Sequence, residues 1–336
     1  MVNVAFLGPL GTYSHQAALQ QFPDAGTVYT PVETIPQCFE ELANDKSLDY
    51  AVVPLENSTN GQVVFTYDIL RDLMNGCEKY NGNEALPELE IVAEQYVSID
   101  LCLIASGAID LTSFGKETDV KVYSHPQVWG QTTNYLKRLG QKVGSLRLID
   151  SASTSGAVQM CCEEGNSVAN EVSLAIASST AANLHTAHIL DGPINDKRGN
   201  TTRFLTLRRR KPKEPPLAAR PSSPITKDQK VSILTFVVKQ DSPGSLVDVL
   251  NVLKEHQINM CSISSRPYHY PKENENSIQQ EDTESKKRKW QYIFFIEVNH
   301  DSSVDWTLVI AGISSNSLKF CFWGTFYRNI RYFETS

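Results

Sequence analysis

The fold is indicated first by the opening unit of the chain, Asn3-Val4-Ala5-Phe6-Leu7-Gly8-Pro9-Leu10-Gly11-Thr12-Tyr13-Ser14. The apolar run 3–7 predicts a buried strand, and the glycines with Pro9 predict the turn that ends it. Ser14 is then in place to cap a helix whose apolar face includes Ala17, Ala18 and Leu19. The segment therefore predicts one strand–turn–helix unit.

The same kind of unit recurs up to residue 207. Strands are predicted at 50–54, within 90–104, and at 121–123, 146–149 and 173–177, with helices at 127–139, after 156 and up to 188. Repeated strand–helix units predict an α/β fold with largely parallel sheets. In such sheets, ligands bind at the carboxyl ends of the strands, where turns and helix N-termini meet.

A basic, proline-rich segment, 208–230, follows with five Pro, eight Lys or Arg and two acidic residues. This composition predicts a stiff, exposed linker. Beyond it, strands are predicted at 231–238, 258–266, 291–298 and 318–328, and helices at about 244–256 and 304–313. The resulting order, βαββαβ, is ferredoxin-like. The polar run 272–289 is predicted to be a surface loop of this second unit.

Composition excludes several functional classes. The 336 residues carry 31 basic and 38 acidic side chains, a net charge of −7, which argues against a nucleic-acid partner. No apolar run is long enough to span a bilayer, and residues 1–9 resemble neither a secretory signal nor a transit peptide. Seven cysteines without a C-x-x-C pair indicate free thiols in a reducing compartment. We therefore expect a cytoplasmic protein that has no membrane or nucleic-acid partner.

Four polar clusters follow predicted strands, at 8–14, 54–61, 151–156 and 199–204. They are rich in hydroxyls, amides and glycine, and Arg203 adds a planar group that suits a carboxylate. Each cluster taken alone is better explained by ordinary helix capping than by ligand binding. Because all four would meet in one cleft, together they predict a small, polar, anionic ligand bound without metal or nucleotide.

These clusters resemble the motifs of the prephenate dehydratase family, in order and in spacing. The matching runs are Gly8–Ser14, Pro54–Ser58 with Gly61, Ser124–Gln127 and Thr202–Phe204. The second unit resembles the family's ACT regulatory domain through Pro243–Leu246, Ser265–Pro267 and Trp323–Tyr327. The resemblance covers nearly the whole chain except the linker and the 272–289 run.

The resemblance implies a catalytic domain, 1–207, made of two α/β lobes like a type 2 periplasmic binding protein. Lobe 1 would comprise about 1–100 and 190–207, and lobe 2 about 101–189. The linker would span 208–230 and the ACT domain 231–336. The implied reaction converts prephenate to phenylpyruvate for phenylalanine synthesis, with no metal or cofactor because aromatisation drives it.

The resemblance also implies site residues. Thr202, Arg203 and Phe204 would be catalytic: Thr202 would hydrogen-bond the leaving hydroxyl, Arg203 would bind a carboxylate and Phe204 would line the apolar part. The polar wall and the remaining substrate contacts would come from Thr12, Tyr13, Asn57, Ser58, Gly61, Ser153 and Thr154. The alternatives are an arogenate dehydratase and a non-catalytic amino-acid sensor.

The second unit is expected to bind L-phenylalanine as a feedback inhibitor between the ACT domains of a homodimer or homotetramer. The residues implied for this role are Gly244, Ser245, Leu246, Ser265 and Arg266. The sequence departs from the family pattern at Ser264, where the family usually has Glu, and at Asn60.

Overall fold

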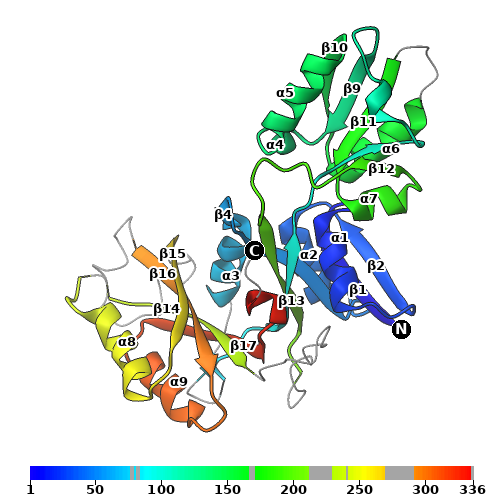
Figure 1. Cartoon of the computed structure of the whole chain (residues 1–336). Helices are drawn as coiled ribbons and strands as arrows, with labels where there is room; N and C mark the ends of the chain where they lie inside the picture. The colour runs from blue at the N-terminus through cyan, green and yellow to red at the C-terminus, as the bar shows by residue number, and fades with distance from the viewer. Residues whose placement is uncertain are drawn as a thin grey trace.

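The chain forms three main β-sheets with their helices in the computed structural model (Figure 1). The structure describes residues 1–75, 79–80, 84–165, 171–211, 229–239, 241–268 and 291–333. The first sheet lies between the other two, so the chain has a central lobe, a second lobe at one end and a C-terminal unit at the other (Figure 1).

The first sheet has the strand order β2-β1-β3-β13-β7, and β4 pairs with β3. Its strands are β1 (Val2–Leu7), β2 (Thr27–Val32), β3 (Tyr50–Asn57), β4 (Gly61–Gln62), β7 (Leu89–Ser98) and β13 (Thr201–Arg209), and its helices are α1 (Tyr13–Gln21), α2 (Ile35–Asn44) and α3 (Val64–Asn75). We call these elements the first lobe. β1 pairs in parallel with β2 and β3, but β13 runs antiparallel to β3 and β7. The sheet is therefore mixed rather than largely parallel, because the chain returns from the second lobe along β13.

The second sheet has the order β10-β9-β11-β8-β12. It comprises β8 (Cys102–Ala105), β9 (Asp119–Ser124), β10 (Ser145–Asp150), β11 (Glu171–Ala177) and β12 (His188–Asp191), with α4 (Pro126–Trp129), α5 (Thr133–Lys142), α6 (Thr154–Glu164), α7 (Ser179–Leu184) and a 3₁₀ turn at Leu111–Ser113. These elements form the second lobe. The strand region predicted at 90–104 divides between the two lobes, as β7 and β8, and the single helix predicted at 127–139 is two helices.

The C-terminal unit has the order β15-β16-β14-β17, all antiparallel. Its elements are β14 (Lys230–Val237), α8 (Ser245–Glu255), β15 (Met260–Tyr268), β16 (Gln291–His300), α9 (Trp306–Ser315) and β17 (Lys319–Tyr327), followed by a 3₁₀ turn at Ile330–Phe333. A two-stranded ribbon, β5 (Lys79–Tyr80) with β6 (Glu84–Ala85), completes the strands. The predicted βαββαβ order is confirmed.

The segment predicted as a linker, 208–230, lies only partly within the described residues. Arg208 and Arg209 belong to β13, and Lys230 begins β14, so the strands extend into both ends of it. Residues 212–228 of the predicted linker and the polar run 272–289 lie outside the described residues.

The C-terminal sheet is covered on both faces. Leu234 and Phe236 of β14 pack with α8 and α9, whereas Ile233 and Val237 belong to the same apolar cluster as Leu207 of β13. This alternation follows from the two-residue period of a strand. One apolar core therefore joins the C-terminal unit to the first lobe.

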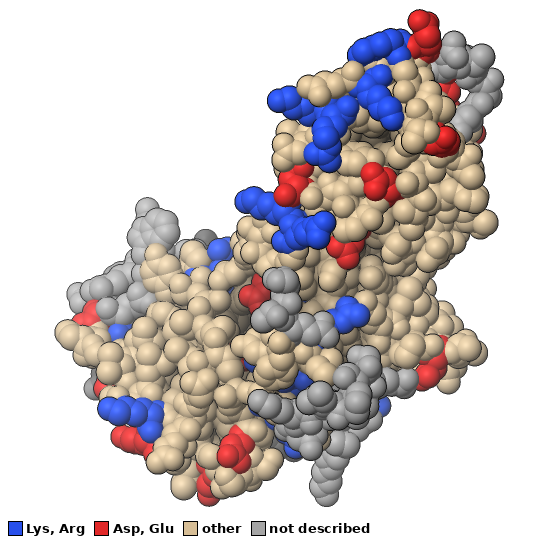
Figure 2. Space-filling model, viewed as in Figure 1, with Lys and Arg blue, Asp and Glu red and all other residues tan. Residues whose placement is uncertain are grey.

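Charged side chains are unevenly spread over the visible face. Lys and Arg are most numerous over the outer end of the second lobe, with Asp and Glu among them (Figure 2). In the described part of the chain, no helix is both long and apolar enough to cross a membrane.

Candidate functional site

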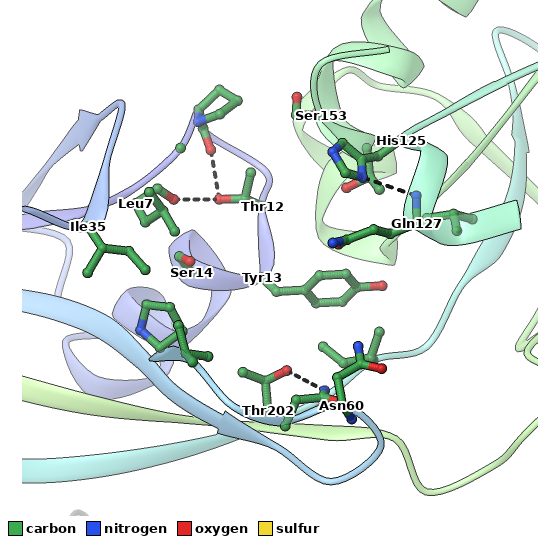
Figure 3. A pocket seen from close by; sticks show the side chains of 18 of the residues that line it. Leu7, Thr12, Tyr13, Ser14, Ile35, Asn60, His125, Gln127, Ser153 and Thr202 are labelled. Atoms are coloured by element: carbon green, nitrogen blue, oxygen red, sulfur yellow. Dashed lines mark hydrogen bonds between the residues drawn. The ribbon is translucent and has the colours of Figure 1, made fainter. Parts of the chain in front are cut away.

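A cavity of about 990 Å³ lies between the two lobes. The turns after β1 and β3 line it from the first lobe, together with Asn200 and Thr202, and the turns after β9 and β10 line it from the second lobe. Figure 3 shows His125 and Ser153 on one side, Thr12 on the other and the Tyr13 ring between them. Of the predicted substrate-binding residues, the lining includes Thr12, Tyr13, Asn57, Gly61, Ser153 and Thr154.

The turn after β1 brings the two lobes into contact. Ser155 of α6 donates its hydroxyl to the Leu10 carbonyl at 2.6 Å, and Ser178 donates to the Gly11 carbonyl at 3.2 Å. Gly11 has φ +84°, and a Cβ there would lie 2.5 Å from the Ser155 hydroxyl oxygen. A glycine is therefore required both by the backbone conformation and by the close approach of α6.

Helix α1 is capped differently from the prediction. Thr12, not Ser14, is the N-cap, and its hydroxyl oxygen accepts from the His15 backbone N–H at 3.3 Å. Ser14 lies inside the first turn of the helix. The same Thr12 hydroxyl donates back toward the Pro9 carbonyl at 2.9 Å, which closes the turn beside the cavity.

His15 fixes the conformation of this turn. Its Nδ1 accepts a hydrogen bond from the Gly11 backbone N–H at 3.0 Å, and its ring stacks on Phe6 with ring centres 4.9 Å apart. Burial lowers the pKa of His15 below its ordinary value of 6.5. The neutral ring is required because a protonated Nδ1 could not accept the Gly11 N–H.

We expect acid to weaken this arrangement. A histidine with a lowered pKa contributes its full stability above the ordinary value of 6.5 and loses it as the pH falls through the folded-state pKa. The melting temperature should therefore fall from pH 7.5 to pH 5.0, and less steeply for His15→Gln. Burial and the nearby charge of Lys230 also lower the pKa of His300, to about 4. His300 should therefore account for the part of the pH dependence that remains in His15→Gln. The exposed His188 supplies the control, since His188→Gln should keep the wild-type slope; equal slopes for all three proteins would contradict the assignment.

Asn57 fixes the hydroxyl of Thr202. The Asn57 Oδ1 accepts from the backbone N–H groups of Thr59 and Asn60 at 3.0 and 2.9 Å, which sets the orientation of the amide. Its Nδ2 then donates to the Thr202 Oγ1 at 2.9 Å and to the Asn200 Oδ1 at 2.7 Å. Since Thr202 receives a hydrogen from Asn57, its own hydroxyl hydrogen can be donated into the cavity.

Asn200 extends this chain to the second lobe. Its Nδ2 donates to the Gln131 Oε1 at 3.2 Å, so Gln131, Asn200, Asn57 and Thr202 form a continuous series of hydrogen bonds across the cavity wall. Neither Asn200 nor Gln131 was predicted as a site residue. Asn200 lies within a predicted polar cluster, whereas no local pattern marks Gln131.

The N-terminus of α6 opens on the same cavity. Ser153 caps it by accepting the Gly156 N–H at 3.0 Å, and both Ser153 and Thr154 line the cavity. An eleven-residue helix presents unpaired N–H groups and the positive end of its dipole there, which favours an anion.

Tyr13 contributes an uncharged side chain to the wall of the cavity. Its hydroxyl donates to the Asp100 carbonyl at 3.2 Å, and burial, with Cys102 and Asp100 nearby, raises the pKa of Tyr13 well above its ordinary range. Its ring crosses the cavity between the lobes (Figure 3).

His125, which belongs to the Ser124–Gln127 motif, lines the second-lobe side of the cavity. Its Nδ1 accepts the Gln127 N–H at 3.3 Å, which caps α4. Because Nδ1 is an acceptor in this contact, the ring hydrogen is on Nε2, and no Lys or Arg is among the described residues that line the cavity.

Three predicted residues do not line the cavity. Ser58 ties the turn after β3 to the returning strand, since it donates to the Gly199 carbonyl and accepts the Thr201 N–H. Phe204 is buried in the core beside Phe6. The structure thus corrects the expectation that Phe204 lines the site.

Arg203 requires the largest correction. It does not face the interlobe cavity, because alternate residues of a strand point to opposite faces and Thr202 faces the cavity. The Arg203 guanidinium binds Glu94, Glu56 and Glu297 instead, and the side chain is 5% exposed. The expected carboxylate contact with substrate is therefore replaced by contacts with the protein's own carboxylates.

The residues predicted to bind phenylalanine lie in two places. Gly244 precedes α8 with φ +89°, and Ser245 and Leu246 begin that helix. Ser265 and Arg266 lie on β15, an edge strand of the sheet, and Arg266 binds Asp68 of α3 at 3.0 and 3.2 Å. Ser264, the departure from the family pattern, accepts a hydrogen bond at 2.8 Å from Gln62, which lines the cavity.

Comparison with known proteins identifies the family to which the chain belongs. The model of the prephenate dehydratase family matches residues 4–212. The chain belongs to the prephenate dehydratase family. A protein of Saccharomyces cerevisiae described as a probable prephenate dehydratase is 46% identical over 346 residues, covering 99% of this chain and 98% of the yeast protein.

Some relatives are longer than this chain. A bifunctional chorismate mutase/prephenate dehydratase of Aquifex aeolicus is 32% identical over 88% of this chain, and the match spans only 65% of the bacterial protein.

Among solved structures, a quorum-quenching acylase, GqqA, aligns with a TM-score of 0.70 at 22% identity, over 99% of this chain and 100% of that one. The prephenate dehydratase of Arthrobacter aurescens in complex with L-Phe aligns with a TM-score of 0.68 at 21% identity, over 97% and 90% of the two chains. At these identities the two structures support the fold alone.

Proposed function

We propose that this chain catalyses the decarboxylating dehydration of prephenate to phenylpyruvate. The observation that carries the proposal is the Thr202 hydroxyl, which Asn57 holds at the wall of the interlobe cavity with its hydrogen free to be donated. Membership of the prephenate dehydratase family supports the same assignment.

The reaction needs three things from the protein. The bond between the ring and its carboxylate breaks, the electron pair completes the aromatic ring, and the ring C–O bond breaks as the hydroxide takes up a proton to leave as water. The protein must therefore hold two carboxylates, assist the leaving hydroxyl and remove water from the departing carboxylate.

The cavity offers a group for each requirement. The N-terminus of α6 at Ser153 and Thr154 suits a carboxylate, and His125 offers a further hydrogen-bond donor through its Nε2–H. Thr202 donates a hydrogen bond to the leaving hydroxyl. The apolar side chains Leu7, Val63 and Val128 provide poorly hydrated surface against which the second carboxylate is lost.

The choice between prephenate and arogenate is tested by the ratio of kcat/KM for the two substrates, with phenylpyruvate and phenylalanine measured as the respective products. We expect prephenate to be preferred. A higher kcat/KM for arogenate would make the chain an arogenate dehydratase, and conversion of neither substrate would favour the non-catalytic sensor.

Regulation by phenylalanine forms part of the same proposal. The C-terminal unit binds L-phenylalanine through the start of α8, at Gly244–Leu246, and through Ser265 and Arg266, between units of a homodimer or homotetramer in the cytoplasm. The solved L-Phe complex of similar fold and the left-handed Gly244 support this role. Phenylalanine should lower kcat and raise the melting temperature by linkage; light scattering with and without it measures the assembly. If phenylalanine changed neither the melting temperature nor the rate, the proposal would be contradicted.

A further inference from the structure

Four charged side chains are buried where the C-terminal unit meets the first lobe. Arg203 of β13, Glu94 of β7, Glu297 of β16 and Arg328, which follows β17, are 5%, 2%, 4% and 3% exposed. Charges removed from water to this degree are tolerated only when each is paired and hydrogen-bonded. We call these four residues the buried charge cluster.

Each member of the buried charge cluster contacts both the first lobe and the C-terminal unit. The Arg203 Nε donates to the Glu94 Oε2 at 2.9 Å, and its Nη2 lies 2.6 Å from the same oxygen and also donates to Glu297. Arg328 donates to both oxygens of Glu94, at 3.2 and 3.0 Å, and to the other oxygen of Glu297. Glu56, half-exposed at the edge, accepts from the Arg203 Nη1 at 2.9 Å. Two arginines and two carboxylates thus form a closed ring.

The cluster is directly attached to the cavity wall. Thr202 and Arg203 are consecutive on β13, with Thr202 opposite Asn57 and Arg203 opposite Glu56 on β3. The register shifts between Arg203 and Phe204, so Leu55 is the additional residue of β3 at that point. The ladder is therefore irregular on the β3 side of the strand, whereas the pairing with β7 continues without a shift from Thr201 to Thr206. On the β3 side, the contacts of the Arg203 side chain provide a further anchor for the backbone next to Thr202.

We propose that Glu297 is a positioning residue for Thr202: the C-terminal unit holds Arg203 through this carboxylate and thereby sets the place of the Thr202 hydroxyl at the cavity. The inference rests on the function proposed above. It gives the regulatory unit a direct physical route to the reacting centre, since any displacement of β16 moves the anchor of Arg203. No substrate contact by Glu297 is involved.

The electrostatics agree with this role. Burial alone would raise the pKa of Glu297, but the guanidinium groups of Arg203 and Arg328 hold it below its usual range. The carboxylate is therefore ionised throughout the neutral pH range, and the contact with Arg203 is a charge-assisted one.

The decisive comparison is between Glu297→Gln and Glu90→Gln. Glu90 of β7 is a matched control, because its carboxylate, with the side chain 12% exposed, is also paired with two arginines, Arg208 at 2.7 Å and Arg210 at 3.3 Å. Its partner on β13 is six residues from Thr202. We expect Glu297→Gln to lower kcat for prephenate by about 10-fold or more with KM changed less than about 2-fold. Glu90→Gln should lower the melting temperature while kcat stays within about 2-fold of wild type.

A second variant separates positioning from simple stability. Glu297→Gln combined with Arg328→Met removes one charge of each sign, so it should recover much of the lost melting temperature without recovering kcat. Phenylalanine should still raise the melting temperature of Glu297→Gln but inhibit it less than wild type. Recovery of kcat together with stability, or a Glu297→Gln enzyme with wild-type kcat and inhibition, would overturn the inference while leaving the proposed function standing. An inactive wild-type protein would overturn both.

Discussion

Thr202→Val should lower kcat for prephenate by about 10²–10³-fold, the usual loss when one preorganised hydrogen-bond donor is removed from an active site. Valine keeps the shape of threonine and its preference for strands, so β13 and its pairing with Asn57 on β3 should remain. KM should change little, because the hydrogen bond to the leaving hydroxyl strengthens only as the C–O bond breaks.

Two controls accompany this variant. Thr202→Ser restores a hydroxyl and should recover a large part of the rate. Thr201→Val alters the neighbouring residue on β13, whose hydroxyl contacts the Gly199 carbonyl at 3.5 Å instead of Asn57, and should keep kcat within a few-fold of wild type. Equal losses for Thr201→Val and Thr202→Val would show that the strand, and not the Thr202 hydroxyl, had been disturbed.

Arg203→Met should destabilise the whole protein by about 3–5 kcal/mol, the typical cost of breaking a buried ion pair from one side. The change leaves Glu94 and Glu297 buried with Arg328 as their remaining cation in the cluster. Denaturant unfolding followed by circular dichroism measures the loss, and Arg203→Lys, which keeps the charge but not the planar group, should fall between wild type and Arg203→Met.

This prediction separates two roles for Arg203. A residue that binds substrate would raise KM on removal and leave the free energy of unfolding nearly unchanged. The buried charge cluster requires the opposite, a large loss of stability with only a small effect on KM. A stable Arg203→Met protein with a strongly raised KM would therefore restore the carboxylate-binding role suggested by the sequence.

The sequence was sufficient for the order of the elements. Strand–helix alternation up to residue 207 and the βαββαβ order beyond it are local patterns, and the polar turns after β1, β3 and β10 could be placed in one cleft because each follows a strand. The capping residue was misplaced by two positions because both Thr12 and Ser14 are good N-caps, and only the backbone of the turn selects Thr12.

The role of Arg203 could not be predicted in the same way. Its partners Glu94 and Glu297 are 109 and 94 residues away in the chain, on strands of two different sheets. The side chains of β13 that face the cavity are set by the register in which β13 pairs with its neighbouring strands. A shift of that register by one residue would turn Arg203 toward the cavity and Thr202 away from it. Gln131 was missed for a related reason, because only the packing of the two lobes brings it to Asn200.

The most direct test is the appearance of phenylpyruvate from prephenate in the presence of the purified 336-residue wild-type protein, with the Thr202→Val variant assayed in parallel at the same concentration. The account predicts rapid formation of phenylpyruvate by wild type and a rate about 10²–10³-fold lower for the variant. Wild-type and variant rates that are equal, or a wild-type rate no faster than the uncatalysed reaction, would contradict it.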